Sequence, residues 1–146
     1  MKVGILGSGD VGQSLANGFL KNGYQVMRGS RDIRKLADWK NGAGAQASVG
    51  TFDEAAAFGE IVVLAVKGLA AETIIKRCGT HLDGKIVIDA TNPIDEKAPT
   101  QGVLQFFTSP NESLMERLQK RCPKGRFVKA FSCVGHAHMV NPSFSG

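Results

Sequence analysis

Short apolar runs alternate along this chain with longer stretches in which apolar residues recur at helical spacing. The apolar runs predict strands at residues 3–6, 24–27, 46–49, 61–66, 85–89 and 126–131. The stretches between them predict helices at residues 11–22, 32–40, 51–59, 69–82 and 109–121. The chain is therefore expected to be built from strands and helices in regular alternation.

Local signals mark several of the predicted helix ends. Gly23 is placed to end the first helix as a C-terminal cap. A capping-box pattern, Thr51 followed by Glu54, opens the third helix. A second such pattern starts at Ser109, with Pro110 at the first helical position, and predicts that the last helix begins there.

The arrangement of strands follows from the run at residues 61–66, Ile-Val-Val-Leu-Ala-Val, which is apolar without alternation. Such a run is typical of a central parallel strand that is buried on both faces. Six strands with intervening helices predict a doubly wound α/β domain with a parallel sheet, in the strand order 3-2-1-4-5-6. We expect residues 1–131 to form this domain. Residues 132–146 are polar and interrupted by glycine and proline, and we expect a C-terminal loop segment at the ligand face.

Composition narrows the class of ligand. The chain has 146 residues, enough for one domain with a proper core, and a net charge of +5. Its basic residues are scattered, and one Tyr and one Trp offer few rings on which bases could stack. The charge therefore indicates a small anionic ligand rather than nucleic acid.

Cysteine usage and the N-terminus bear on the compartment. The three cysteines, Cys78, Cys122 and Cys133, are far apart and predict neither a disulfide framework nor a metal site. We expect Cys133 to be a buried, inert thiol. The N-terminal apolar run is too short for a signal peptide, and no run approaches transmembrane length. A cytoplasmic protein without a membrane contact is expected.

The stretch between the first strand and the first helix carries the spacing G-x-G-x-x-G, at Gly7, Gly9 and Gly12. In a dinucleotide-binding loop the first glycine allows the tight turn, the second lets the backbone approach a pyrophosphate, and the third lets helix and strand pack closely. The free N–H groups at the helix start then face the phosphates. The position predicts a Rossmann NAD(P)-binding domain. The expected cofactor contacts here are Gly7, Ser8, Gly9, Asp10, Val11 and Gly12, with Asp10 contributing its backbone only.

The end of the second strand indicates which dinucleotide is bound. An acidic residue there would bind the ribose 2′-hydroxyl of NAD, but the chain has Ser30 and Arg31, with Lys35 one helical turn later. A guanidinium can fork onto a 2′-phosphate, Ser30 can donate a hydrogen bond, and Lys35 can add a point charge. NADP is therefore the expected cofactor. The alternative is a solvated basic helix start in which Asp32 favours the helix N-terminus.

Loops after the later strands should surround the nicotinamide, because ligands of open α/β sheets bind at the carboxyl ends of the strands. Candidate cofactor contacts in these loops are Ala65, Val66, Lys67, Asn92 and Pro93. For Lys67, an exposed lysine without a ligand is an equal alternative.

His136 follows the sixth strand and is a candidate substrate contact, although no partner for it is visible. No convincing general acid or base emerges, and this suits hydride transfer between a nicotinamide and a flavin-like ring, in which the protein mainly aligns the two rings.

Five segments stand in this order along the chain: KVGILGSGDVG, GSRD-x-x-K, IVVLAV, IDATNP and VKAF. In them the chain resembles the NADP oxidoreductases dependent on coenzyme F420, and it is similar to the cytosolic domains of transmembrane ferric reductases. The resemblance implies NADP contacts by Ser8, Gly9, Asp10, Val11, Ser30, Arg31, Lys35, Val66 and the Asn92 loop. Members of the family continue past their sixth strand with elements that close the substrate site and contribute to a dimer. A homodimer is among the expected partners of this chain.

Two functional hypotheses result. The first is an NADP(H)-dependent oxidoreductase that passes hydride to or from a flavin, a deazaflavin or another small acceptor. The second is a non-catalytic NADP(H)-binding sensor or subunit whose site is completed by a partner.

Overall fold

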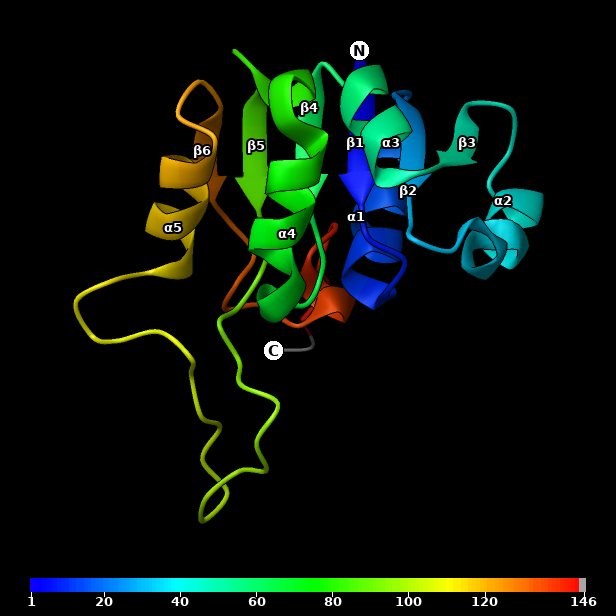
Figure 1. The fold of residues 1–146 in the computed structure, drawn as a ribbon. Coiled ribbons are helices and arrows are strands. Elements are labelled where there is room, and N and C mark those ends of the chain that lie inside the picture. Colours follow the sequence, from blue (N-terminus) through cyan, green and yellow to red (C-terminus); the bar gives the residue numbers. More distant parts are fainter. Residues whose placement is uncertain (145–146) are drawn as a thin grey trace.

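A computed structural model describes residues 1–144, and its strands form one parallel sheet in the order β3-β2-β1-β4-β5-β6 (Figure 1). The strands are β1 (Lys2–Leu6), β2 (Gln25–Gly29), β3 (Ala47–Gly50), β4 (Ile61–Leu64), β5 (Ile86–Asp89) and β6 (Arg126–Lys129). The helices are α1 (Asp10–Lys21), α2 (Ala37–Gly42), α3 (Phe52–Phe58), α4 (Gly68–Cys78) and α5 (Leu114–Arg121). Short 3₁₀ turns lie at Ile33–Leu36, Gly79–Leu82 and His136–His138. The doubly wound fold and its strand order are confirmed.

Two apolar layers lie on opposite faces of the sheet, because successive strand residues point to opposite sides. On the face that carries α3, α4 and α5, buried Leu6 and Leu64 pack with Ile75 and Leu118 (Figure 1). On the face that carries α1 and α2, Ile5 and other strand residues pack with the helix side chains. The central strands are thus buried on both sides, as the unbroken apolar run at residues 61–66 predicted.

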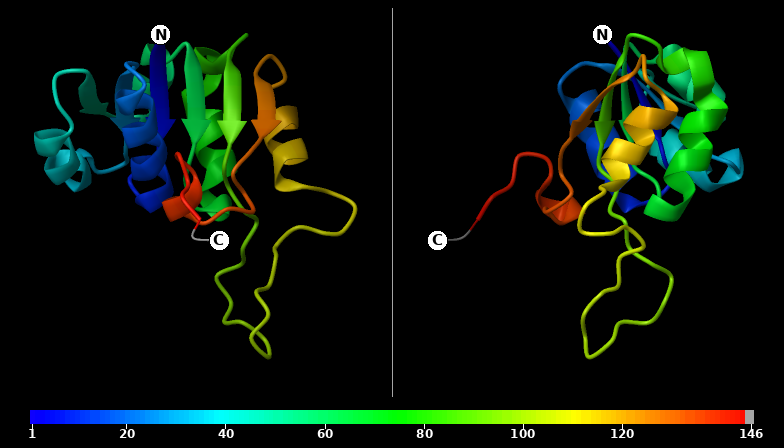
Figure 2. Two further views of the ribbon diagram at one scale, coloured as in Figure 1. Left: turned by 180° about the vertical axis from the view of Figure 1, so that it is seen from behind. Right: turned by 60° about the vertical axis from the view of Figure 1, so that its left-hand side comes forward.

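The last two strands lack such cover on the α1 face among the described residues. In the view from behind, no helix lies over β5 and β6 (Figure 2). Accordingly, 37% of Ile86 and 50% of Val128 are exposed. The C-terminal residues instead pack against α1, where Val140 approaches Gly18 so closely that a Cβ on the glycine would lie 2.6 Å from a Val140 methyl group.

The start of the last helix differs from the prediction. The helix α5 begins at Leu114, because Ser113 and Glu116 form the capping box: each side chain bonds the backbone N–H of the other residue. The expected start at Ser109 is wrong. Residues 93–109 instead form a long arm that projects from the carboxyl edge of the sheet, tied by single bridges such as Ile94 with Phe106 (Figure 1).

Two other predicted helices are shorter or broken. The segment 32–40 is a 3₁₀ turn followed by α2, and the Asp32 side chain accepts the Arg34 N–H at the start of that turn. Gly79 adopts φ +49° and interrupts the helix predicted at 69–82. The capping box of α3 at Thr51 and the end of α1 before Gly23, which adopts φ +80°, are confirmed.

Candidate functional site

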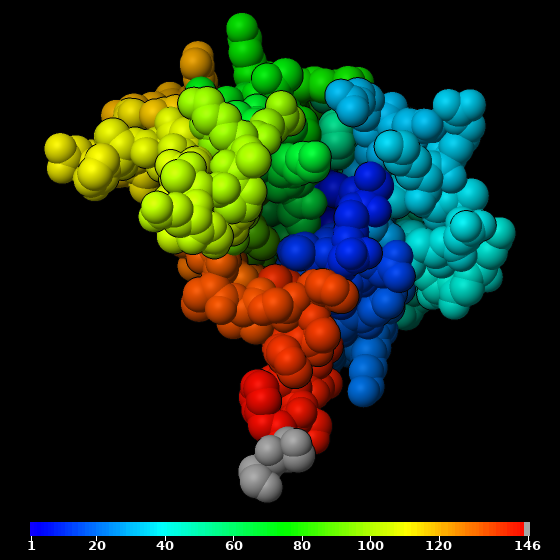
Figure 3. Space-filling model, turned by 90° about the horizontal axis from the view of Figure 1, so that it is seen from below, coloured from blue at the N-terminus to red at the C-terminus, as the bar shows by residue number. Residues whose placement is uncertain are grey.

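The carboxyl ends of the strands form the edge on which the candidate site lies. The glycine-rich loop after β1 stands between the loops after β2 and β4, at the point where the strand order reverses. Figure 3 looks onto this edge, where the N-terminal residues in blue border residues in green and the C-terminal segment in orange. Two hollows open here, one on each side of the glycine-rich loop.

The glycine-rich loop is shaped by three glycines for three different reasons. Gly7 adopts φ +151°, and a Cβ on it would lie 2.1 Å from the Ala65 carbonyl oxygen. A Cβ on Gly12 would lie 2.9 Å from the Gly7 oxygen, so helix α1 and strand β1 need a glycine to pack this closely. A Cβ on Gly9 would meet nothing within 4 Å, because it would project into open space. That open space is where a dinucleotide-binding loop accommodates the pyrophosphate.

Asp10 occupies the first position of α1, and its side chain is exposed. The N-cap residue, Gly9, offers no side chain to bond the free N–H groups of this helix. These donors are therefore left for other groups, while the Asp10 carboxylate favours the positive end of the helix dipole.

The first hollow has a volume of about 600 Å³ and lies on the β2 side of the loop. The expected residues that line it are Gly7, Ser8, Gly9, Ser30, Arg31, Lys35, Ala65, Val66 and Lys67. The sequence did not single out Phe52, Ile74 and Arg77, which also line it and offer an apolar wall with a cation at its rim. An aromatic base could pack on the apolar wall, and a ribose with its charged groups could lie near the cation.

The charges in the first hollow are arranged so that Arg31 and Lys35 have no ion-pair partner among the described residues. Asp32 is held by Arg34 through two hydrogen bonds, of 2.9 and 3.0 Å. This pairing holds the pKa of the Asp32 carboxyl below its usual range. Among residues 1–144, no carboxylate lies within ion-pairing distance of Arg31 or Lys35, and both are exposed. The hollow is thus prepared for an anion, as a 2′-phosphate site requires.

The second hollow, of about 500 Å³, lies on the β5 side of the loop and shares Gly9, Ala65, Val66 and Lys67 with the first. Its other expected lining residues are Asp10, Val11, Asn92 and His136. Gly68 lets α4 start against the β5 loop, since a Cβ there would lie 2.1 Å from the Asn92 oxygen. Asn92 in turn donates to the Ser132 oxygen at 2.9 Å and joins the loops after β5 and β6.

Two expected site residues, Gly12 and Pro93, line neither hollow. Gly12 is buried beneath the loop. Pro93 turns toward a separate depression beside α5. Cys133 is exposed, so the expectation of a buried thiol there is wrong. His136 is exposed at the rim of the second hollow, with its Nδ1 3.4 Å from Ser14 Oγ.

Sequence reasoning missed an ion pair between a buried carboxylate and a lysine at the ends of β5 and β6. Asp89 is fully buried and accepts hydrogen bonds from the Thr91 N–H at 2.9 Å and the Thr91 hydroxyl at 2.7 Å. Its other oxygen pairs with Lys129 Nζ at 3.0 Å, and Lys129 also donates to the Thr91 carbonyl. The pair joins the two strands and fixes the backbone that precedes Asn92. An Asp and a Lys 40 residues apart give no local signal of such a contact.

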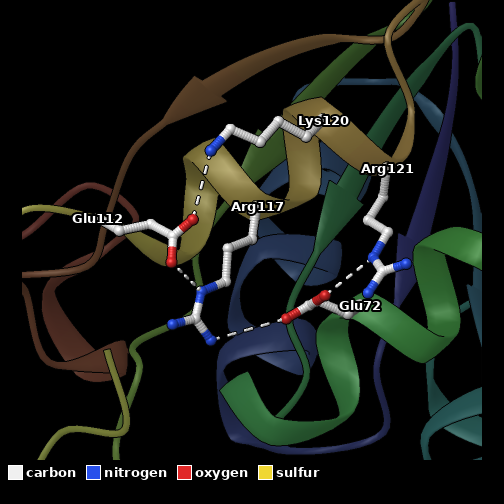
Figure 4. A pocket seen from close by; sticks show the side chains of 5 residues that line it. All are labelled: Glu72, Glu112, Arg117, Lys120 and Arg121. Atoms are coloured by element: carbon white, nitrogen blue, oxygen red, sulfur yellow. Dashed lines mark hydrogen bonds and ion pairs between the residues drawn. The ribbon is translucent and has the colours of Figure 1, made fainter. Parts of the chain in front are cut away.

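A third hollow, of about 440 Å³ between α4 and α5, is lined by charged side chains (Figure 4). Glu112 accepts from Arg117 at 3.0 Å and from Lys120 at 3.3 Å, while Glu72 pairs with Arg121 at 3.0 Å and with Arg117 at 3.9 Å. The three cations and the two carboxylates all take part in ion pairs, and the cluster links the two helices. Within the described residues no cluster of His, Cys, Asp and Glu could hold a metal ion. No helix in that part of the chain is long and apolar enough to cross a membrane.

Comparisons with known proteins agree with this geometry. The sequence model of the family described as "NADP oxidoreductase coenzyme F420-dependent" matches residues 2–93. The chain is 31% identical over 133 residues to the metalloreductase STEAP3 of Rattus norvegicus. That match covers 91% of this chain and 25% of the relative, so the chain spans about a quarter of that protein's length.

Solved structures show the same fold. A proposed F420-dependent NADP reductase from Arthrobacter sp. fb24 superposes with a TM-score of 0.89 at 27% identity, over 97% of this chain and 67% of that one. A hypothetical protein from Sinorhizobium meliloti gives a TM-score of 0.75 at 24% identity, over 94% of this chain and 63% of that one, which shows the fold alone. The family match confirms the resemblance and the NADP cofactor that the sequence predicted.

Proposed function

The chain belongs to the family of coenzyme F420-dependent NADP oxidoreductases, and from that premise we propose that it transfers hydride between the nicotinamide of NADP(H) and a flavin-like or other small acceptor. One observation carries this proposal. The two hollows meet at Gly9, Ala65, Val66 and Lys67. The first hollow also holds Arg31 and Lys35, which have no ion-pair partner in the described part of the chain. A dinucleotide has this same organisation, with a phosphorylated adenosine at one end and a redox-active ring at the other.

The residues in the first hollow fit the adenosine half of NADP. Arg31 and Lys35 would hold the 2′-phosphate, and Ser30, whose Oγ accepts the Asp32 N–H at 3.2 Å, still has its hydroxyl proton to donate. The open space above Gly9 would take the pyrophosphate against the free N–H groups of α1. A side chain on Gly9 would fill that space.

The second hollow would hold the nicotinamide half. Val66 offers an apolar contact there, and Asn92 is kept in place by its bond to the Ser132 oxygen. When bound, NADPH supplies the hydride, and a flavin-like ring accepts it without a proton donor from the protein. The chain's own residues then have to align the two rings and limit the access of water. Lys67, exposed at the junction of the hollows, is free to contact the diphosphate or the acceptor.

The need for His136 would distinguish hydride transfer to a flavin-like ring from the reduction of a carbonyl. Reduction of a carbonyl needs a proton donor, and His136 is the histidine at the rim of the second hollow. Transfer to a flavin-like ring does not need it. We therefore propose that His136 contacts the acceptor and is not required for the transfer of hydride.

Anaerobic stopped-flow mixing tests the proposed reaction. NADPH absorbance is followed after mixing the full chain with FMN, coenzyme F420 or ferric citrate in separate experiments. We expect oxidation with at least one acceptor, and we expect His136→Ala to retain it with a flavin-like acceptor. Tight NADPH binding without oxidation by any acceptor would instead support a non-catalytic sensor, or a subunit completed by a partner.

We also propose that the chain acts as a homodimer. The exposed apolar side chains on the arm and on β6 support this proposal: 64% of Val103, 60% of Phe106 and 50% of Val128 are exposed. Sedimentation equilibrium measures the mass directly. A monomer at every concentration tested would contradict the proposal.

Two further expectations remain proposals. We propose a cytoplasmic location, which the free thiols of Cys78, Cys122 and Cys133 support. We also propose that residues 132–146 form a C-terminal segment at the cofactor and substrate face, next to the domain of residues 1–131. His136 at the rim of the second hollow supports this division, although residues 145–146 lie outside the described part of the chain.

A further inference from the structure

Arg28 is a charged side chain with only 1% of its surface exposed, and it lies directly behind the glycine-rich loop. Its Nη2 donates to the carbonyl oxygens of Gly9, at 3.1 Å, and Gly7, at 3.3 Å. Its Nη1 donates to Gln13 Oε1 at 3.4 Å. A buried arginine commonly pairs with a carboxylate, whereas the guanidinium here bonds oxygen atoms that carry no net charge.

The bonds to Gly7 and Gly9 determine how the loop is turned. The carbonyls of both residues point inward, to the guanidinium, and buried carbonyls need donors. The Gly9 oxygen also accepts the Gln13 N–H of α1 at 3.0 Å, so Arg28 is its second donor. A peptide group that directs its carbonyl inward directs its N–H the other way. The two hydrogen bonds from Arg28 Nη2 therefore favour the loop conformation in which the N–H groups of the loop are available to a ligand on the outer side.

Trp39 holds the guanidinium from the opposite side. The Arg28 guanidinium carbon lies 4.9 Å from the centre of the Trp39 ring, within cation–π distance. The ring is itself fixed, since Trp39 Nε1 donates to Asn17 Oδ1 at 2.8 Å. Arg28 Nε has no hydrogen-bond partner among the described residues. The positive charge thus stays incompletely neutralised inside the protein, on the side of the loop away from solvent.

This charge persists at neutral pH. Burial lowers the pKa of Arg28 to about 10, and the nearby negative charge of Asp10 opposes the decrease. Arg28 therefore remains protonated under ordinary conditions and offsets Asp10, which would otherwise repel an anion at the start of α1.

We propose that Arg28 is a positioning residue for the pyrophosphate: it holds the Gly7 and Gly9 carbonyls inward and supplies the positive charge that counterbalances Asp10. The inference rests on the proposed function, because it needs a dinucleotide in the site. It has a specific consequence. NADP and NAD share the pyrophosphate, so Arg28 acts equally on both, whereas Arg31 acts on NADP alone.

Three ligands distinguish the positioning role from a general structural one. NADPH carries both the pyrophosphate and the 2′-phosphate, NADH carries only the pyrophosphate, and adenosine 2′-monophosphate carries only the 2′-phosphate. Their Kd values are measured by calorimetry for the wild type, Arg28→Met and Arg31→Ala. Methionine is chosen because it keeps an unbranched chain without charge or donors.

We expect Arg28→Met to weaken NADPH and NADH by the same factor, of about tenfold to a hundredfold, and to leave adenosine 2′-monophosphate unchanged. Arg31→Ala should weaken NADPH and adenosine 2′-monophosphate and spare NADH. Unchanged NADPH binding in Arg28→Met overturns the inference, and so does an equal loss of all three ligands, which would indicate general damage. A wild type that binds neither dinucleotide overturns the proposed function, and this inference with it.

A second variant keeps the test usable if Arg28→Met does not fold. Lysine retains the charge, but its ammonium group lacks the planar, branched set of donors of a guanidinium. A buried amine also loses its proton more readily than a guanidinium. In Arg28→Lys the Kd for NADPH should therefore rise, relative to the wild type, as the pH increases from about 6 to 9. A ratio of Kd values that equals one at every pH overturns the inference.

Discussion

The preference for NADPH over NADH depends, in the proposed site, on an exposed guanidinium that no carboxylate of residues 1–144 neutralises. Arg31 lies in the first hollow, while the neighbouring Asp32 is taken up by Arg34 through two hydrogen bonds. We therefore expect Arg31→Ala to remove a charge-assisted contact to the 2′-phosphate. NADH has no such phosphate, and its affinity should not change.

The magnitude follows from the exposure of Arg31. A hydrogen bond to a charged group contributes about 1.5–3 kcal/mol, and solvent screening moves an exposed residue to the lower part of this range. About 1.5–2 kcal/mol corresponds to a tenfold to thirtyfold increase in the Kd for NADPH. Lys35, a point charge one turn further on, should add about threefold in the double variant Arg31→Ala/Lys35→Ala.

Fluorescence titration with NADPH and NADH at constant ionic strength measures both affinities. Lys76→Ala is the matched control, because Lys76 is an exposed cation of α4 that lines neither hollow. Its replacement lowers the net charge by the same amount as Arg31→Ala. The NADPH preference should also shrink as salt is added, since salt screens exposed charges. An equal loss of NADPH and NADH affinity in Arg31→Ala would refute the assignment of the 2′-phosphate site.

Three further predictions concern the loop, a helix start and the ion-pair cluster. Gly9→Val should keep the melting temperature of the wild type and abolish dinucleotide binding. Gly7→Ala should lower the melting temperature, because of these two glycines only Gly7 would bring a Cβ against backbone, at 2.1 Å. The opposite pattern in thermal melts and titrations would contradict the roles given to the two glycines. Ser113→Ala should destabilise the protein by about 1 kcal/mol in urea unfolding, as loss of a helix N-cap does, and Ser109→Ala should have no such effect. Arg117 and then Lys120 hold the pKa of the Glu112 carboxyl below its usual range, so its contribution to stability is present above the unfolded pKa and is lost as the pH falls through the folded pKa. Glu112→Gln should therefore melt lower than the wild type at pH 7, and the two should converge once the pH falls below the folded pKa of Glu112. A difference that stays constant as the pH falls through the acid range would contradict this origin.

Much of the fold was predictable because its signals are local. The run of residues 61–66 indicated a strand buried on both faces, and the spacing of Gly7, Gly9 and Gly12 indicated the turn from β1 into α1. Helix ends were less certain, because Ser109 and Ser113 each precede a glutamate by three residues. The pattern fits both serines equally, and the packing of Leu114 and Leu118 into the core selects the second.

By itself, the sequence determined the parallel fold, the glycine-rich loop and the cations at the end of β2, because each depends on residues that are close along the chain. Only the tertiary structure decided that Arg28 lies behind the loop, bonded to Gly7, which is 21 positions away in the sequence, and that Asp89 pairs with Lys129. A strand position next to a glycine gives no indication of what its side chain contacts. The partner of a buried charge is set by which distant segments pack around it, since a charge inside the protein is stable only where that packing supplies its hydrogen bonds.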